Sequence, residues 1–258
     1  MISEFFKSAF RHILHNKIYA IINIAGLAIG IGCGLVIYQI ISYESGFDRY
    51  HKNFSNIYRL INEVNDPVEG LNYYEGQVHP LGKALRNDFP GIEAAMCFYA
   101  AKGQITIENN DGTSDKFMEN SGLVYAEPDI FNIFDFEFLA GDPSKALANT
   151  GSVVISSSLA QKYFKFSAPN VDEALGRSII INNKTTFQIT GIISDPPDNT
   201  DLPFKIIADY GSQPASNPYY NNGTDWNEYN SATNCYILLP DGTSAKDIEK
   251  QLVSFFHK

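Results

Sequence analysis

Asp48, Arg49 and His51 are the residues in this sequence most able to do chemistry together. A carboxylate, a guanidinium and an imidazole at such short spacing could form a catalytic cluster. The three residues begin about one helical turn beyond the end of a long apolar run. We therefore interpret them as a polar collar that joins a membrane span to the domain after it.

No other group of residues indicates a reaction. His51 and His79 lie far apart and have no carboxylate or cysteine at the spacing of metal ligands. The serines at 156–158 are typical of a strand end and a helix cap rather than of a nucleophile elbow. The chain also has no G-x-x-x-x-G-K-[ST] motif, which would cradle phosphates. The sequence predicts no catalytic, cofactor-binding or metal-binding residues, and ATP, if used, would be bound by another polypeptide.

The three cysteines, Cys33, Cys97 and Cys235, form no CxxC motif. Cys33 lies in the apolar run. Cys97 and Cys235 could pair only if the fold brought them together, and we interpret both as buried free thiols.

The apolar run covers residues 18–43, which are 26 positions without a charged side chain. A bilayer core about 30 Å thick needs about 20 helical residues. Twelve Ile, Leu or Val residues in the run favour insertion by about 4–7 kcal/mol. The run predicts one transmembrane helix over residues 18–43.

Charged residues on either side of the run predict its orientation. Three basic residues precede it and two acidic residues follow it: Lys7, Arg11 and Lys17, then Glu44 and Asp48. By the positive-inside rule the N-terminus is cytoplasmic, and about 215 residues lie outside. Residues 1–17 are predicted to be a cytoplasmic amphipathic segment, or alternatively a continuation of the span. A signal peptide would need a shorter apolar region and a cleavage site, and no convincing site follows the run.

Inside the span, Gly26, Gly30 and Gly34 form two consecutive GxxxG spacings. In lipid, such a smooth stripe lets another helix approach closely. Glycine is also frequent in membrane helices in general, which is the alternative explanation. We expect the stripe to pack against a partner helix.

The rest of the chain has the composition of a globular domain. Of the 258 residues, 44% are hydrophobic and 19% are charged. The net charge of −10 argues against a nucleic-acid partner, because phosphate binding needs a basic surface. The 16 basic and 28 acidic residues after position 43 give this part a net charge of −12.

Short strands and helices alternate after residue 55. Residues 55–100 indicate a β-α-β unit with strands at 57–64 and 92–100 and a helix at 77–88. Residues 229–258 indicate a strand at 234–239 and a helix at 244–256. Because a β-α unit normally returns as a strand, we expect the protein to continue beyond Lys258.

The intervening residues 101–228 are predicted to be β-rich. Hairpins are expected at 104–119 and 178–193, a buried strand at 153–155, and a capping box that starts a helix at Ser158–Gln161. The expected fold is α+β: one N-terminal transmembrane helix, then a periplasmic domain of two α/β subdomains. Residues 55–100 and 229–258 would form a split subdomain, with 101–228 inserted as a β-rich subdomain and loop.

Motifs along nearly the whole chain resemble MacB/FtsX-type permeases of ABC transporters. They are Phe5-Phe6-Lys7 with Ala9-Phe10-Arg11, Ile22–Gly30, Tyr43-Glu44, Phe47–His51, Ile57-Tyr58-Arg59, Tyr125–Pro128, Ile133–Phe136, Leu139–Pro143, Val153–Ser156, Lys162-Tyr163-Phe164 and Gly191–Pro197. The order and spacing of these motifs carry the resemblance. The chain departs from the family pattern in having no later spans.

The resemblance implies a MacB-like periplasmic core domain over residues 44–258, held in the bacterial inner membrane. It also implies a permease homodimer or heterodimer, a separate ABC ATPase subunit and a possible periplasmic adaptor. Such systems couple cytoplasmic ATP hydrolysis to periplasmic movement or to export of an antimicrobial, peptide or lipoprotein.

Two other classes of protein remain as alternatives. A single-span anchored ligand-binding or sensor domain would act without transport, but a sensor predicts a signalling module, for which 17 residues leave no room. A membrane-anchored enzyme predicts converging titratable residues, and the sequence offers none.

Overall fold

A computed structural model describes residues 11, 15, 17–109, 111–165, 170–215, 226 and 229–256. The chain divides into two compact units, residues 1–47 and residues 48–258. Lys7 and most of the predicted amphipathic segment lie outside the described residues. Arg11 is helical and exposed, and Lys17 is the first residue of the long helix described next.

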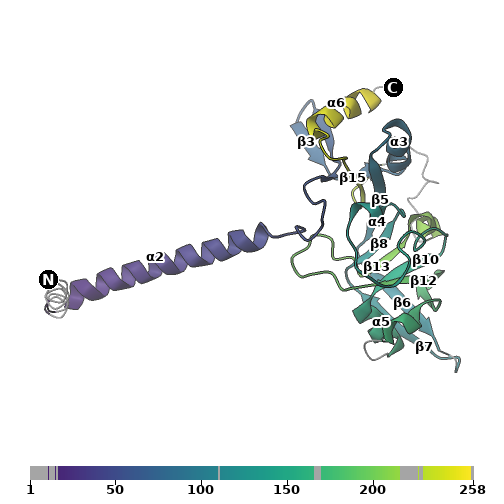
Figure 1. The fold of residues 1–258 in the computed structure, drawn as a ribbon, viewed down its shortest axis with the longest axis horizontal. Helices are drawn as coiled ribbons and strands as arrows, with labels where there is room; N and C mark the ends of the chain where they lie inside the picture. Colours follow the sequence, from purple (N-terminus) through teal and green to yellow (C-terminus); the bar gives the residue numbers. More distant parts are fainter. Residues whose placement is uncertain are drawn as a thin grey trace. The chain divides into compact units, whose positions relative to one another are not determined.

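The first unit is dominated by helix α2, Lys17–Glu44, which has 28 residues and no buried side chain (Figure 1). At a rise of about 1.5 Å per residue, α2 exceeds the thickness of a bilayer core. It is the one helix of the described residues that is long and apolar enough to cross a membrane. A Cβ added at Gly26, Gly30 or Gly34 would meet nothing within 4 Å. The packing of this stripe against another helix stays a prediction.

The second unit contains the strands and the shorter helices. The strands are β1 Ile57–Arg59, β2 Asn62–Asp66, β3 Gly70–Tyr74, β4 Gln77–Val78, β5 Glu93–Ala100, β6 Gly103–Glu108, β7 Ser114–Glu119, β8 Leu123–Ala126, β9 Phe138–Gly141, β10 Ser152–Ser156, β11 Ser178–Ile181, β12 Thr185–Ile193, β13 Ile206–Asp209, β14 Tyr229–Asn230 and β15 Thr233–Leu238. The helices are α3 Leu81–Asp88, α4 Ile130–Ile133, α5 Ser157–Phe164 and α6 Ala245–Phe256, with 3₁₀ turns η1 Asn170–Ala174 and η2 Tyr210–Ala215.

An 11-stranded sheet organises this unit. Its order is β1-β15-β5-β8-β13-β10-β12-β11-β6-β7, and β9 also pairs with β12. The pairs β10–β12 and β8–β13 are parallel, and the other pairs of this sheet are antiparallel. Every residue of β8, β10 and β13 is buried, as expected for strands that are covered on both faces.

Helices cover the two faces of the sheet unequally. On one face, Leu85 of α3, Tyr163 of α5 and Ile248 of α6 belong to one buried cluster. On the other face, Ile130 of α4 and Phe204 belong to a second cluster. The mixed α+β fold class is therefore confirmed, with an apolar helix followed by a sheet-rich domain (Figure 1).

The two buried cysteines lie in neighbouring strands of this sheet and remain free thiols. Cys97 pairs in register with Asn234, next to Cys235. Because side chains alternate along a strand, Cys97 packs in the cluster around α4 and Cys235 packs in the cluster on the opposite face. This placement separates the two sulfur atoms by the thickness of the sheet.

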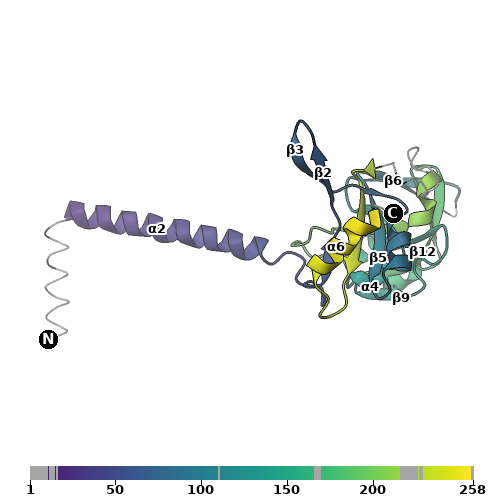
Figure 2. The ribbon, with the colours of Figure 1, turned by 90° about the horizontal axis from the view of Figure 1, so that it is seen from above.

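The predicted strand at 57–64 is wrong in its extent. β1 ends at Arg59, and β2 pairs with β3 in a separate two-stranded sheet. Figure 2 shows this hairpin extending away from the main sheet. Its turn is closed by Asp66, whose Oδ1 accepts the N–H groups of Val68 and Glu69 at 2.7 and 2.9 Å. The residues that favour a strand between Ile57 and Val64 are thus divided between two short strands of different sheets.

The predicted start of one helix and the predicted cap of another are also wrong. The helix expected at 77–88 begins at Leu81, because Gln77–Val78 pairs as β4 with β14 and Pro80 precedes the helix. The helix expected from a capping box at Ser158 begins at Ser157, and its N-cap residue makes no side-chain capping bond. The strands predicted near 92–100, 104–107, 116–119, 153–155 and 234–239 and the hairpin at 178–193 are confirmed.

Strands from the predicted split subdomain, β1, β15 and β5, are neighbours at one end of the sheet. The strands of residues 101–228 continue the same sheet from β8 to β7, and residues 48–258 form one compact unit. The division into two subdomains stays a prediction.

A partly buried ion pair fastens α3 to the sheet. Arg86 Nη1 lies 2.7 Å from Glu127 Oε2, and Arg86 Nη2 lies 2.9 Å from Glu127 Oε1. Glu127 Oε2 also accepts the N–H of Met96 at 2.9 Å. Such bidentate, charge-assisted hydrogen bonds are stronger than neutral ones.

We predict that Glu127→Ala lowers the free energy of unfolding by about 2 kcal/mol, because it removes the bidentate partner of Arg86 and the acceptor of the Met96 N–H, while Arg86 keeps the Ala94 carbonyl and Asp129. Urea denaturation of the chain in detergent micelles, followed by circular dichroism, measures this loss. Lys145→Ala is the matched control: its pair with Asp142 is exposed, and its removal should change stability by less than about 0.5 kcal/mol. Equal losses in the two variants would contradict the prediction.

Candidate functional site

Residues 48–52, here called the junction segment, begin the second unit. Asp48 has a φ angle of 55°, a left-handed conformation that Asp adopts more readily than most residues. Its N–H donates to the carbonyl of Asn199 at 3.2 Å. Its carboxylate accepts the hydroxyl of Thr200 and, at 3.2 Å, the N–H of Asp201. Asp48 thus binds the junction segment to the loop at 199–201.

His51 binds the junction segment to a second loop. Its side chain is 2% exposed, and its Nδ1 accepts the N–H of Asp135 at 3.1 Å. The centroid of the imidazole ring lies 4.0 Å from the ring centroid of Tyr50 and 5.1 Å from that of Phe134. Because Nδ1 is an acceptor, the proton of the neutral ring is on Nε2, which has no hydrogen-bond partner among the described residues. Burial lowers the pKa of His51, although Asp48 and Asp135 act in the opposite direction.

Lys52 contacts the same loop as His51, and Arg49 contacts an aromatic ring. The Lys52 N–H donates to Asp135 Oδ2 at 2.6 Å, and Lys52 Nζ lies 3.8 Å from Asp135 Oδ1. The Arg49 guanidinium lies over the Phe54 ring, 5.8 Å from its centroid. The structure therefore attaches Asp48 and His51 to the domain by different loops. His51 Nδ1 is bound to a backbone N–H rather than to a carboxylate, so the arrangement is not that of an acid–base pair.

Asp195, in the loop after β12, caps helix α5. Its Oδ2 accepts the Ser158 N–H at 3.0 Å and the Ser157 hydroxyl at 2.8 Å, and its Oδ1 accepts the Ser158 hydroxyl. Burial would raise the pKa of Asp195, but these hydrogen bonds outweigh it and lower the pKa. The helix that the sequence assigned to a local capping box is thus capped by a residue 37 positions away.

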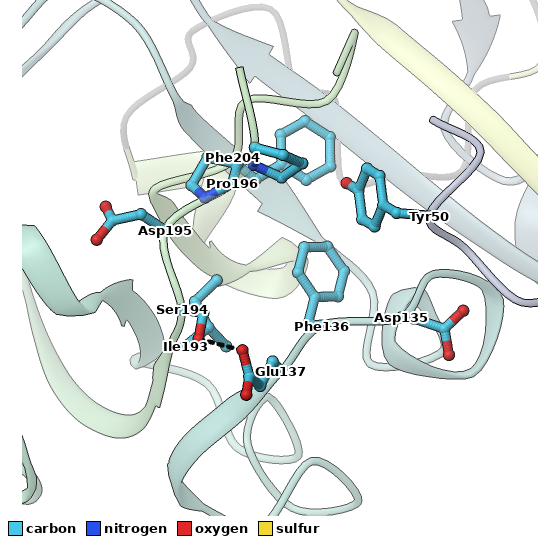
Figure 3. Close-up of a pocket in the computed structure, with 10 residues that line it drawn as sticks. Tyr50, Asp135, Phe136, Glu137, Ile193, Ser194, Asp195, Pro196 and Phe204 are labelled. Carbon is cyan, nitrogen blue, oxygen red and sulfur yellow. Dashed lines mark hydrogen bonds between the residues drawn. The ribbon is translucent and has the colours of Figure 1, made fainter. Parts of the chain in front are cut away.

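A pocket lies beside the junction segment (Figure 3). It has a volume of about 140 Å³ and is lined by Tyr50, Asp135, Phe136, Glu137, Ile193, Ser194, Asp195, Pro196, Pro197 and Phe204. The Ser194 hydroxyl donates to Glu137 Oε2 at 2.6 Å. Of these residues, Tyr50 lies within the predicted collar in sequence, and Asp135 is hydrogen bonded to His51 of the collar. No local sequence signal predicts that Phe136 and Phe204, from distant segments, lie in one wall.

Metal ligation finds no support in the described residues, which contain no group of three or more His, Cys, Asp or Glu side chains able to hold an ion. The carboxylates nearest the pocket are instead committed to hydrogen bonds with serines and backbone N–H groups. The arrangement is chemically suited to positioning loops and to non-covalent binding.

The apolar helix and the sheet-rich unit after it define a membrane-anchored α+β protein. The sequence profile of the MacB-like periplasmic core domain matches residues 20–255. The chain belongs to this family, and the identification as the periplasmic domain of a MacB/FtsX-type ABC transporter permease is confirmed.

Two solved structures share the fold. One is a domain assigned to a permease protein from Porphyromonas gingivalis, with a TM-score of 0.62 and 18% identity over 80% of this chain and 84% of that one. The other is the periplasmic region of MacB from Actinobacillus actinomycetemcomitans, with a TM-score of 0.51 and 14% identity over 78% of this chain and 83% of that one. No curated protein sequence matches the chain.

His51 generates a prediction about pH. Its pKa is lower in the folded protein than the ordinary value of 6.5, so the unfolded chain binds a proton more readily. Folding stability from this residue is therefore complete above about pH 6.5 and is lost as the pH falls towards the folded pKa. His51→Gln, which keeps an acceptor for the Asp135 N–H but cannot titrate, should reduce the loss of stability between about pH 7.5 and about pH 5.5.

Urea denaturation at the two pH values measures this difference. His15→Gln is the control, because it makes the same replacement at an exposed histidine of the first unit. If His51→Gln retained the full pH dependence, another group would be responsible.

Proposed function

We propose that this chain is the membrane-anchored, extracytoplasmic part of an ABC transporter permease in the bacterial inner membrane, with its N-terminus in the cytoplasm. A separate ABC ATPase subunit hydrolyses ATP. The junction segment passes movement of α2 to the sheet, and this movement drives export of a substrate such as an antimicrobial, a peptide or a lipoprotein.

The observation that carries the proposal is the attachment of the junction segment on two sides. Asp48 is hydrogen bonded to the loop at 199–201, and His51 and Lys52 are hydrogen bonded to Asp135 after α4. A flexible linker would dissipate movement, whereas packed side chains and hydrogen bonds transmit it. Asp48, Arg49 and His51 therefore act as the connection between span and domain, with Asp48 and His51 as its two anchors.

Charge and composition support the orientation and the partners. Basic residues precede α2, and the domain after it is acidic, in agreement with a cytoplasmic N-terminus. The stripe of Gly26, Gly30 and Gly34 suits a helix that packs against other spans of a permease homodimer or heterodimer. A periplasmic adaptor would bind the extracytoplasmic domain.

The second candidate is an anchored ligand-binding domain without transport activity. The pocket beside the junction segment is the observation that favours it. Co-purification separates the two candidates: a permease component associates with an ABC ATPase, and an isolated anchored receptor does not.

If the junction segment transmits movement, a variant of Asp48 should allow ATP hydrolysis without the movement of the domain. Asp48→Gly keeps the backbone conformation accessible but removes the acceptor for Thr200 and Asp201. In the full permease with its ATPase, phosphate release should continue, while the ATP-dependent fluorescence change of a label on Val68→Cys should fall by at least about half. Val68 is 92% exposed, and a Cys33→Ser background removes the exposed native thiol.

Asp66→Gly is the matched control, since Asp66 also accepts two backbone N–H groups but lies in the β2–β3 turn. It should leave phosphate release and the fluorescence response intact. A full response in Asp48→Gly would refute transmission through the junction segment.

The proposed packing of α2 against other spans can be tested at its glycine stripe. Gly30→Leu should weaken association of α2 with the other permease spans by about 1–2 kcal/mol, because it fills the stripe. Neither Gly30 nor Gly32 has an atom within 4 Å of an added Cβ, so any loss comes from a partner. Gly32→Leu, on a different face of the same helix, is the control. Co-purification with a tagged remainder of the permease measures association, and unchanged association of Gly30→Leu would remove the packing role.

A further inference from the structure

The floor of the pocket beside the junction segment is aromatic and apolar. The rings of Phe136 and Phe204 are nearly parallel, with an interplanar angle of 20° and centroids 6.3 Å apart. Ile193 and Phe204 are each 1% exposed, and Pro196 and Pro197 complete the apolar wall (Figure 3). Aromatic faces carry partial negative charge and attract cations that approach within about 6 Å.

The rim of the pocket is acidic. Asp135, Glu137 and Asp195 are its acidic lining residues, with the Asp135 and Asp195 carboxylates turned outward (Figure 3), and none of the lining residues is Lys, Arg or His. Asp135 is occupied by Lys52, and both oxygens of Asp195 accept hydrogen bonds from α5. In the part of the chain that the structure describes, Glu137 Oε1 has no hydrogen-bond or ion-pair partner. This oxygen is the one that can pair with an incoming cation.

The size of the pocket limits its occupant. Its volume of about 140 Å³ is below the range of about 300–1,000 Å³ that is typical of pockets for drug-sized ligands. This room corresponds to one long side chain rather than to a whole small molecule.

We propose that this pocket binds one basic side chain, lysine or arginine, of a polypeptide partner. The methylene stem packs on Phe136, Pro196 and Pro197, as long basic side chains do on apolar surfaces. The charged end is stabilised by the Glu137 carboxylate and by the partly exposed ring of Phe136. The net charge of −12 after residue 43 attracts a basic partner from a distance.

Charge complementarity favours a polypeptide over a lipid headgroup as the occupant. A phosphoethanolamine headgroup also offers an ammonium group, but it carries a phosphate next to it. The lining residues provide no basic side chain for that phosphate, and their carboxylates would repel it. A lysine or arginine side chain carries its positive charge alone at the end of an apolar stem.

The proposal concerns the domain alone and does not depend on coupling to ATP hydrolysis. A permease component and an anchored receptor would use the same pocket. Failure of the binding test therefore leaves the coupling experiment unaffected, and failure of the coupling experiment leaves the pocket unaffected.

The test is a ligand-observed NMR titration of the full chain in detergent micelles. The probes are Nα-acetyl-lysinamide, Nα-acetyl-argininamide and the uncharged Nα-acetyl-norleucinamide, which keeps the apolar stem. We expect millimolar dissociation constants for the two basic probes and binding at least about tenfold weaker for the uncharged probe. Binding of the basic probes should also weaken with added salt, because the Glu137 interaction is exposed to solvent.

Two variants locate the binding in the pocket. Glu137→Gln keeps an acceptor for Ser194 and removes the charge, and should weaken binding of both basic probes by about three- to tenfold. Phe136→Leu keeps an apolar wall and removes an aromatic face, and should weaken binding by about two- to fivefold. Glu63→Gln, which removes the same charge from the exposed β2 strand, is the control and should bind as the unmodified chain does.

Equal binding of the charged and uncharged probes would overturn the proposal, because the pocket would then be a purely apolar surface. Equal weakening by Glu63→Gln and Glu137→Gln would also overturn it, since only the overall charge would matter. Tighter binding of glycerophosphoethanolamine than of the lysine probe would assign the pocket to lipid instead. Circular dichroism verifies that each variant is folded.

Discussion

Strands β8, β13 and β10 are mostly apolar, and each is buried on both faces. A strand in the middle of a sheet can be buried in this way only if separate layers cover both sides. Helices α3, α5 and α6 form one layer, and α4 forms the other with the loops around Phe134 and Phe204. The second layer is rich in aromatic residues, and the pocket lies beside it, with Phe136, Ile193 and Phe204 in its lining.

Aspartates then fix the loops of this layer. Asp48, Asp135 and Asp195 each accept at least one backbone N–H group from a segment distant in sequence. A carboxylate has two oxygens and can bind several donors at once, so one residue can hold a loop that has no regular backbone pairing. The same residues are left with little capacity for other partners. Glu137 differs because one of its carboxylate oxygens has no hydrogen-bond partner among the described residues. Binding of a cation would therefore depend on Glu137.

The residues that attach the junction segment lie close to the residues that line the pocket. Tyr50 belongs to the junction segment and also lines the pocket, and Asp135 binds the junction segment while contributing to the rim. Any occupant of the pocket would therefore contact residues that hold the junction segment in place. A ligand can shift a conformational equilibrium only through its differential affinity for the two states. Residues shared between the pocket and the junction segment provide the contacts through which such a difference would arise.

The sequence by itself determined the elements whose signals are local. The apolar run at 18–43 identified α2, because insertion depends on summed hydrophobicity. The Asn182-Asn183 turn identified the β11–β12 hairpin, because both residues adopt positive φ angles. The order of the motifs identified the family. Only the tertiary structure decided that the run from Ile57 to Val64 divides between two sheets, that Asp195 rather than Ser158 caps α5, and that Phe136 and Phe204 form one wall. These features depend on contacts between residues far apart in the chain, and local propensity carries no information about such contacts.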